Sequence, residues 1–437
     1  MNNRILSLLE TIRTSFWFIP ALLVFSATLL ASLVLSYDRY WQDYTPEFLQ
    51  FIYHTSPEST RAILTTIASS MMTVTSIAFS ITVVALSLAS SQFGPRLIRN
   101  FMSDRGTQSV LGVFVAIFIY CLLVLQSTKS VEDLQFIPGM ATYFAVLLAF
   151  VGVGVLIYFI HHVSYAIQAD DVVDKVHCQL QKDIDRLFPN QTEWNKQSEP
   201  KALFMNNVNF SQAVKAGKDG YVQTVDFEKL VAIAKEHDIK INVLAKAGDA
   251  IVKSSTLLEL SVETVKSLPD DAALRNCIML GAKRTPLQDP EFAVRQLVEI
   301  AVRALSPGIN DPYTAITCTD KLCAMLCDLS QRPFPPSLHT DDEGEIRVCT
   351  RSFEFSQIAN ASFNQIRQYG KDSIAVTIRL LESLILIAEH AATDNQKGFV
   401  QEQSDMIGQA CEQSTFCNKD KADINYRLQQ IREILEK

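Results

Sequence analysis

Four long runs without a charged side chain occupy most of residues 1–164, and they limit the possible fold more than any other feature. A helix needs about 20 mostly apolar residues to cross the roughly 30 Å of hydrocarbon in a bilayer. We therefore predict a membrane domain of four transmembrane helices at residues 15–164. The four runs are Ser15–Ser36, Ala62–Ser91, Val110–Gln126 and Ile137–Ile160.

Charge divides the chain into two parts. Residues 1–164 hold eight Lys/Arg and eight Asp/Glu, so the formal net charge of −8 comes from residues 165–437. An acidic part without a basic cluster argues against nucleic acid as a partner. The nine scattered cysteines contain no C-x-x-C pair, so we expect no metal site, no cofactor and a reducing compartment.

The loops between the runs predict the orientation. Basic residues gather at the start of the chain and after the second run, whereas the loop after the first run is mainly acidic. Short basic loops stay on the cytoplasmic side. We therefore expect both ends of the chain to be cytoplasmic, including residues 1–14 and everything after residue 164. The basic residues are Arg4, Arg13, Arg96, Arg99 and Arg105.

The second run is rich in hydroxyl side chains that recur at helical spacing. Seven of them lie on one face of a helix, because their steps of three, four and seven residues match its period. Small hydroxyl residues favour close contact between helices in a membrane. Alternatively, such a stripe lines water in a pore around an oligomer axis, with Arg96 and Arg99 at its cytoplasmic mouth. The stripe consists of Thr66, Ser69, Thr73, Ser76, Ser80, Ser87 and Ser91.

The cytoplasmic part begins with a helical connector and linker at residues 165–200. Short branched runs punctuated by glycine follow at 201–265, with one amphipathic helix that starts at Asp226; they predict a small β-barrel or sandwich module. Residues 266–437 show helical periodicity and predict a helical domain. The expected fold is thus a membrane α-helical domain with a cytoplasmic α+β domain, a β module followed by a helical bundle.

A specific turn separates two helices of the last part. The segment "RALSPGINDPYTAI" stops one helix near Pro307, because proline disfavours helix at the residue before it. Asp311-Pro312 repeats the start signal of Asp289-Pro290, with aspartate as the cap and proline at the first helical position. We interpret it as a structural corner, and an anion site at the helix start is the alternative. Its residues are Arg303, Ser306, Pro307, Gly308, Asn310, Asp311 and Pro312.

Two segments resemble a known family. "ALSPGINDPYTA" (304–315) and "SSQFGPRLIRNFMSDRGTQSVLGVFVAIFIYCLLVL" (90–125) are similar to an uncharacterised family of bacterial predicted membrane proteins. The resemblance extends over most of the chain. It implies four N-terminal spans, a cytoplasmic domain and a place in the bacterial inner membrane, and it carries no reaction or ligand.

These patterns leave two functions open. The first is a homo-oligomeric, channel-like protein in which the second span lines the axis, ions are the permeant species and the cytoplasmic domain is a vestibule or sensor. The second is a membrane-anchored scaffold or regulator whose cytoplasmic domain binds a protein or small effector, without a conducting pore. We expect no enzyme, because no catalytic arrangement is visible in the sequence.

Overall fold

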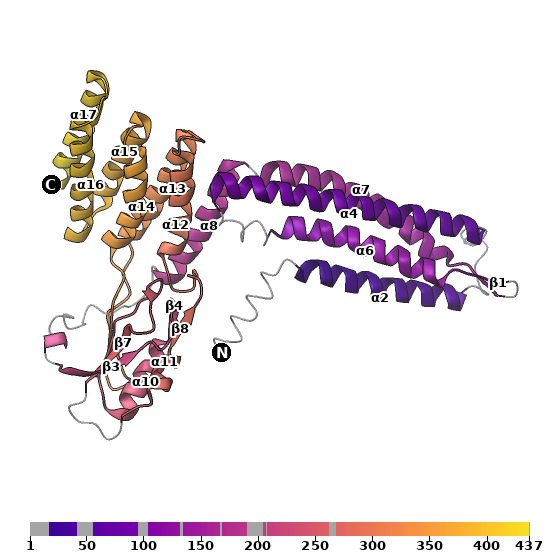
Figure 1. The fold of residues 1–437 in the computed structure, drawn as a ribbon, viewed down its shortest axis with the longest axis horizontal. Coiled ribbons are helices and arrows are strands. Elements are labelled where there is room, and N and C mark those ends of the chain that lie inside the picture. The colour runs from indigo at the N-terminus through magenta and orange to yellow at the C-terminus, as the bar shows by residue number, and fades with distance from the viewer. Residues whose placement is uncertain are drawn as a thin grey trace. The chain divides into compact units, whose positions relative to one another are not determined.

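The chain divides into two compact units, which a computed structural model describes at residues 17–41, 56–94, 104–131, 134–166, 168–189, 204–206, 208–261 and 268–436. Unit 1 is Met1–Val172 and unit 2 is Val173–Lys437. Figure 1 shows the helices of unit 1 in indigo to purple and unit 2 in magenta to yellow. Helix α8 (Ala169–Leu187) begins at the end of unit 1 and lies mostly in unit 2.

The described residues of unit 1 form four long helices. All four are long and apolar enough to cross a membrane, and each overlaps one of the predicted runs, so the prediction of four candidate spans is confirmed. A short hairpin of β1 (Lys129–Val131) and β2 (Leu134–Phe136) joins the last two. The helices are α2 (Phe18–Trp41), α4 (Pro57–Phe93), α6 (Arg105–Ser127) and α7 (Gly139–Ala166).

Helix α6 is the centre of unit 1. It contacts α2, α4 and α7, and its side chains Phe114, Tyr120 and Cys121 are fully buried. Besides apolar packing, a few polar contacts connect the helices near the β1–β2 end. Asp38 of α2 accepts hydrogen bonds from the N–H groups of Met140 and Ala141, at 3.2 and 3.0 Å. These bonds satisfy two of the free N–H groups at the start of α7.

The described strands of unit 2 form two sheets. The larger has the strand order β3-β7-β5-β10-β9, with β10 and β5 parallel, and the smaller has the order β6-β4-β8. Helix α10 (Phe227–His237) begins at Asp226 as predicted, since the Asp226 carboxylate accepts from the N–H of Lys229 at 3.2 Å. The strands are β3 (Phe210–Lys215), β4 (Gly220–Val225), β5 (Ile241–Val243), β6 (Ala250–Ile251), β7 (Thr256–Ser261), β8 (Ile278–Gly281), β9 (Leu338–Thr340) and β10 (Ile346–Thr350).

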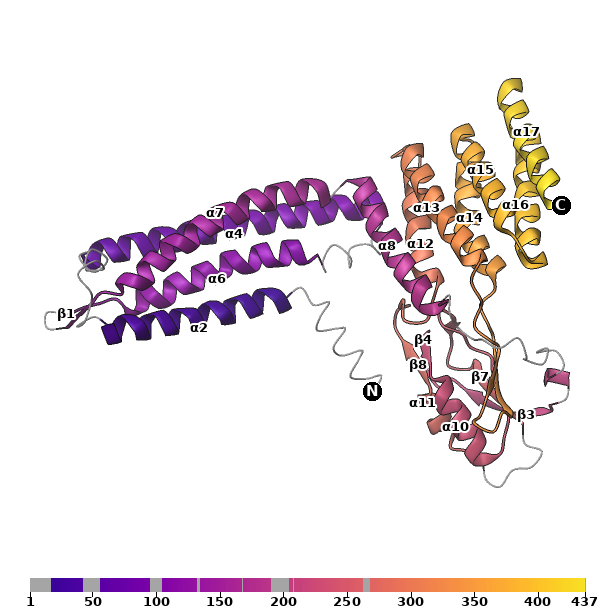
Figure 2. The ribbon, with the colours of Figure 1, turned by 180° about the vertical axis from the view of Figure 1, so that it is seen from behind.

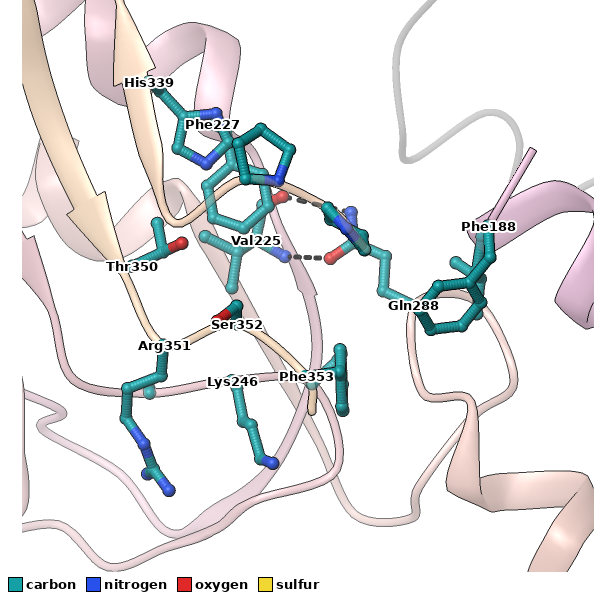
Figure 3. A pocket seen from close by; sticks show the side chains of 15 residues that line it. Phe188, Val225, Phe227, Lys246, Gln288, His339, Thr350, Arg351, Ser352 and Phe353 are labelled. Atoms are coloured by element: carbon teal, nitrogen blue, oxygen red, sulfur yellow. Dashed lines mark hydrogen bonds between the residues drawn. The ribbon is translucent and has the colours of Figure 1, made fainter. Parts of the chain in front are cut away.

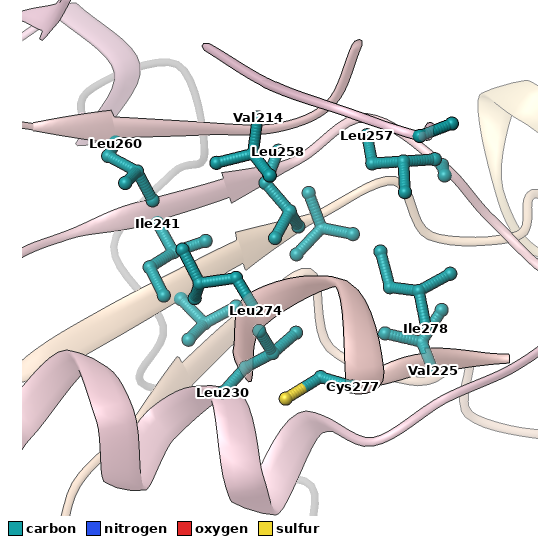
Figure 4. Packing of buried hydrophobic residues seen from close by; sticks show 14 of the residues in the cluster. Val214, Val225, Leu230, Ile241, Leu257, Leu258, Leu260, Leu274, Cys277 and Ile278 are labelled. Atoms are coloured by element: carbon teal, nitrogen blue, oxygen red, sulfur yellow. The ribbon is translucent and has the colours of Figure 1, made fainter. Parts of the chain in front are cut away.

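Both sheets bury their apolar side chains in one core, which Figure 4 shows with α10 and α11 (Asp271–Asn276). The strand order gives two separate sheets and does not show closure into a barrel. Three strands, β8, β9 and β10, lie beyond residues 201–265, in the part predicted to be helical. That prediction was wrong for these segments, because strands of three to five residues carry too little periodicity to stand out between helices.

The remaining helices of unit 2 stack in two layers. Helices α12, α14 and α16 contact one another in sequence, and so do α13, α15 and α17; Figure 2 shows the stack from behind. Each amphipathic hairpin buries its apolar face against the next one. The helices are α12 (Glu291–Ala304), α13 (Pro312–Ser330), α14 (Phe355–Gly370), α15 (Ile374–His390), α16 (Asp394–Glu412) and α17 (Asn418–Leu435).

Candidate functional site

The hydroxyl stripe of α4 lies on the side of the helix that faces away from the core of unit 1. Successive residues turn by about 100°, and the buried positions of α4 include Leu64, Ala68, Met71 and Ala78. The stripe is on the opposite side by this spacing, and all of its members are exposed in the single chain. These are Thr66, Ser69, Thr73, Ser76, Ser80, Ser87 and Ser91.

Most of the stripe hydroxyls already donate a hydrogen bond to their own helix. Six of the seven do so, for example Ser76 to the carbonyl of Met72 at 3.0 Å and Ser80 to the carbonyl of Ser76 at 2.9 Å. Each of these hydroxyl donors is therefore satisfied within its own helix, and the hydroxyl oxygen can still accept a hydrogen bond. The stripe presents small side chains and acceptor oxygens to its surroundings.

Large apolar side chains border the stripe on both sides. Met72 and Phe79 are exposed along one edge, and Ile77, Ile81 and Leu88 along the other. A narrow neutral polar band between apolar edges distinguishes this helix face from an all-apolar lipid surface. The predicted mouth residues, Arg96 and Arg99, lie outside the described residues.

The corner between α12 and α13 is held by hydrogen bonds within the turn. The Ser306 hydroxyl donates to the carbonyl of Arg303 at 2.6 Å, and the N–H of Asp311 donates to the carbonyl of Ala304 at 2.7 Å. Asn310 has a φ of 51°, a left-handed conformation that asparagine tolerates better than most residues. The turn thus reverses the chain within the six residues between Ala304 and Asp311.

The start of α13 is capped by its own chain. The Asp311 carboxylate accepts from the N–H of Thr314 at 3.1 Å and from its hydroxyl at 2.5 Å, and Pro312 is the first helical residue. Arg303 lies 3.7 Å from Glu299 on its own helix. The geometry gives each of these charges a local role, and Asp311 already fills the position that an anion would take.

The earlier Asp-Pro signal behaves differently from the one in the corner. Helix α12 begins at Glu291, one residue later than the pattern predicts, with Pro290 at the cap position. Asp289 accepts from the N–H of Glu291 at 3.1 Å but also pairs with Arg284, 2.6 Å away. The buried ion pair with Arg284 holds Asp289 in place, and the local sequence pattern does not predict this pair.

A polar pair connects two helices of unit 1. His162, near the end of α7, lies 2.6 Å from the Asp104 carboxylate that caps α6. Over the residues that the structure describes, no three His, Cys, Asp or Glu side chains gather as a metal site would require.

Unit 2 contains a cavity that no local sequence pattern predicts. A cavity of about 180 Å³ lies beside the two sheets (Figure 3), lined by aromatic rings together with Lys246 and Arg351. Its residues come from six segments between 187 and 353. Only the folded chain brings them together, so no local signal could have found the site.

Comparison with known proteins identifies a family of predicted membrane proteins and relatives that are uncharacterized. The sequence model of a family described as "Predicted membrane protein (DUF2254)" matches residues 13–385. The uncharacterized proteins Mb1321c of Mycobacterium bovis and Rv1290c of Mycobacterium tuberculosis are each 30% identical over 394 residues, which cover 89% of this chain and 75% of theirs. No solved structure matches the chain at a significant level.

Proposed function

We propose that this chain, which belongs to the family of predicted membrane proteins (DUF2254), is a homo-oligomeric, channel-like membrane protein. Helix α4 lines the shared axis, and unit 2 serves as a vestibule or sensor. We place it in the bacterial inner membrane, with both ends cytoplasmic, on the basis of the basic loops.

The outward position of the α4 stripe is the observation that carries this proposal. Within one chain, α4 turns its apolar side to the core and its hydroxyl side outward. Lipid offers no hydrogen bonds to the exposed acceptor oxygens, whereas a neighbouring helix or a water-filled axis does. A second copy of the chain supplies either environment to the whole stripe at once.

The length of α4 fits a central position. It has 37 residues, against 24, 23 and 28 in the other three helices, and so measures roughly 55 Å at about 1.5 Å per residue. A helix of that length extends past the hydrocarbon or tilts. A neutral lining predicts weak ion selectivity, and Arg96 and Arg99 at the mouth would favour anions against the opposing charge of the acidic unit 2.

The test combines an assembly measurement with a conductance measurement. We expect native mass spectrometry of the purified protein in mild detergent to show an oligomer, and planar bilayer recording to show single-channel currents. Ser76→Leu and Ser80→Leu should abolish the current, because a larger apolar side chain closes a narrow wet axis. Ser32→Leu on α2 is the matched control, since Ser32 is also exposed and bonded to its own helix, and it should leave the current unchanged.

Two results would contradict the pore. A monomer in mild detergent removes the shared axis altogether. An oligomer without current, in which Ser76→Leu only weakens assembly, means that α4 forms a dry contact and favours a membrane-anchored scaffold or regulator instead.

A further inference from the structure

The cavity of unit 2 lies where segments far apart in the sequence meet. It is bordered by the end of α8, the β4–α10 junction, the loop after β5, Gln288 before α12, the start of β9 with the residues before it, and the end of β10 with the residues after it. Four rings dominate its walls in Figure 3: Phe188, Phe227, His339 and Phe353. Aromatic walls of this kind favour a flat ring as the occupant, because rings stack on one another or meet edge to face.

One end of the cavity is a flat, uncharged aromatic pair. The ring of His339 stacks on the ring of Phe227, with centroids 4.6 Å apart and an angle of 14° between the planes. Burial lowers the pKa of His339 below its ordinary value, so the imidazole is neutral at pH 7. This end therefore offers aromatic surface and no charge.

The other end carries two cations. Lys246 and Arg351 both extend on the side away from His339 in Figure 3. The Lys246 ammonium lies 2.7 Å from the Gln357 side-chain oxygen and 4.7 Å from the centre of the Phe353 ring. Arg351 pairs with Asp249 at 3.2 Å. Among the described residues no carboxylate pairs with Lys246, so one positive charge at this end lacks a counter-ion.

The size of the cavity limits the occupant. A cavity of about 150 Å³ holds benzene, and typical pockets for drug-sized ligands measure about 300–1,000 Å³. The roughly 180 Å³ here suits one ring with a short side chain. A nucleotide or a lipid tail with its headgroup is too large.

We propose that this cavity binds a small aromatic carboxylate. Its ring packs among Phe188, Phe227 and Phe353, and its carboxylate replaces Gln357 as the partner of Lys246, with Arg351 as a second donor. A charged hydrogen bond in a partly buried place is stronger than a neutral one. The inference depends on unit 2 alone and is independent of a pore along α4.

Calorimetric titration of the full-length protein in lipid nanodiscs tests this site. The probe is phenylacetate, phenylacetamide is its uncharged equivalent, and empty nanodiscs correct for partition into lipid. We expect saturable binding of one phenylacetate per chain and at least about 10-fold weaker binding of the amide, the ratio that loss of one charged hydrogen bond gives.

Three variants locate the binding. Lys246→Met should weaken phenylacetate binding at least about 10-fold. Lys253→Met is the matched control, because Lys253 is exposed and lies outside the cavity lining, and it should bind as the unchanged protein does. Ser352→Phe fills the cavity and should prevent binding while the melting temperature is retained, which keeps the test valid if Lys246→Met does not fold.

The proposal is overturned if phenylacetate, cinnamate and indole-3-acetate all fail to bind saturably. It is also overturned if the amide binds as tightly as the acid, or if folded Lys246→Met and Ser352→Phe both bind as tightly as the Lys253→Met control.

Discussion

The two units satisfy their polar groups in opposite ways. In unit 1, hydroxyls on α2 and α4 donate to carbonyls of their own helix, and the charged ties that the structure describes lie near helix ends. In unit 2, charged side chains join different elements: Arg332, which follows α13 and has a side chain only 5% exposed, binds Asp185 of α8. The solvent explains the contrast, because charges inside hydrocarbon are costly, whereas a water-soluble fold tolerates them when they are paired.

The substitution Arg284→Met in unit 2 has the largest expected effect on stability among the tests of this contrast. The side chain of Asp289 is 1% exposed and lies 2.6 Å from Arg284, and burial, the dominant cause, raises the pKa of Asp289. Removing Arg284 leaves a buried carboxylate unpaired, so we expect a loss of about 3–5 kcal/mol in the free energy of unfolding. Chemical denaturation of unit 2 in the full-length protein measures it.

The pH dependence of this variant identifies the cause. A carboxyl with a raised folded pKa loses stability as pH rises through that pKa, so Arg284→Met should recover part of its loss as pH falls below 7. The double variant Arg284→Met/Asp289→Asn should recover part of it at pH 7, because the amide carries no charge. A loss that is independent of pH and unaffected by Asp289→Asn would contradict the ion-pair explanation.

Asp38→Ala tests the corresponding tie in unit 1. Asp38 is fully buried and its carboxylate accepts from two N–H groups at the start of α7. We expect a loss of about 2 kcal/mol, since bonds to a charged acceptor contribute about 1.5–3 kcal/mol. Thermal exposure of buried Cys121, in a background without other cysteines, reports unfolding of unit 1. Asp38→Asn should lose less, and equal stability of all three proteins would show that the tie is unimportant.

Asp311→Ala has the smallest expected effect. Asp311 caps the helix that directly follows it and is less buried than Asp38, which caps a helix from a different part of the chain. We expect a loss of about 1 kcal/mol, within the range of about 0.5–2 kcal/mol for helix caps, measured by thermal unfolding of unit 2. Asp311→Asn keeps an acceptor and should lose only part of that. Unchanged stability together with altered binding of inorganic phosphate would assign the corner to an anion instead.

Long local patterns were predictable from the sequence, and contacts between distant segments were not. The four candidate spans follow from continuous apolar runs, and the caps at Asp226 and Asp311 follow from a few adjacent residues. Strand β10 could not be placed in the same way, because it pairs with β5, which lies about 100 residues earlier. Hydrogen bonds between strands leave no trace in the spacing of neighbouring residues.

The candidate sites divide along the same line. The spacing of Ser76 and Ser80 put them on one face of α4, but the packing of Leu64 and Met71 against the other helices decided that this face points outward. The cavity beside Lys246 and His339 exists only in the tertiary structure. The sequence by itself determined which segments are helices and which residues share a face, because backbone geometry is local; the fold decided which faces meet, because burial depends on the whole chain.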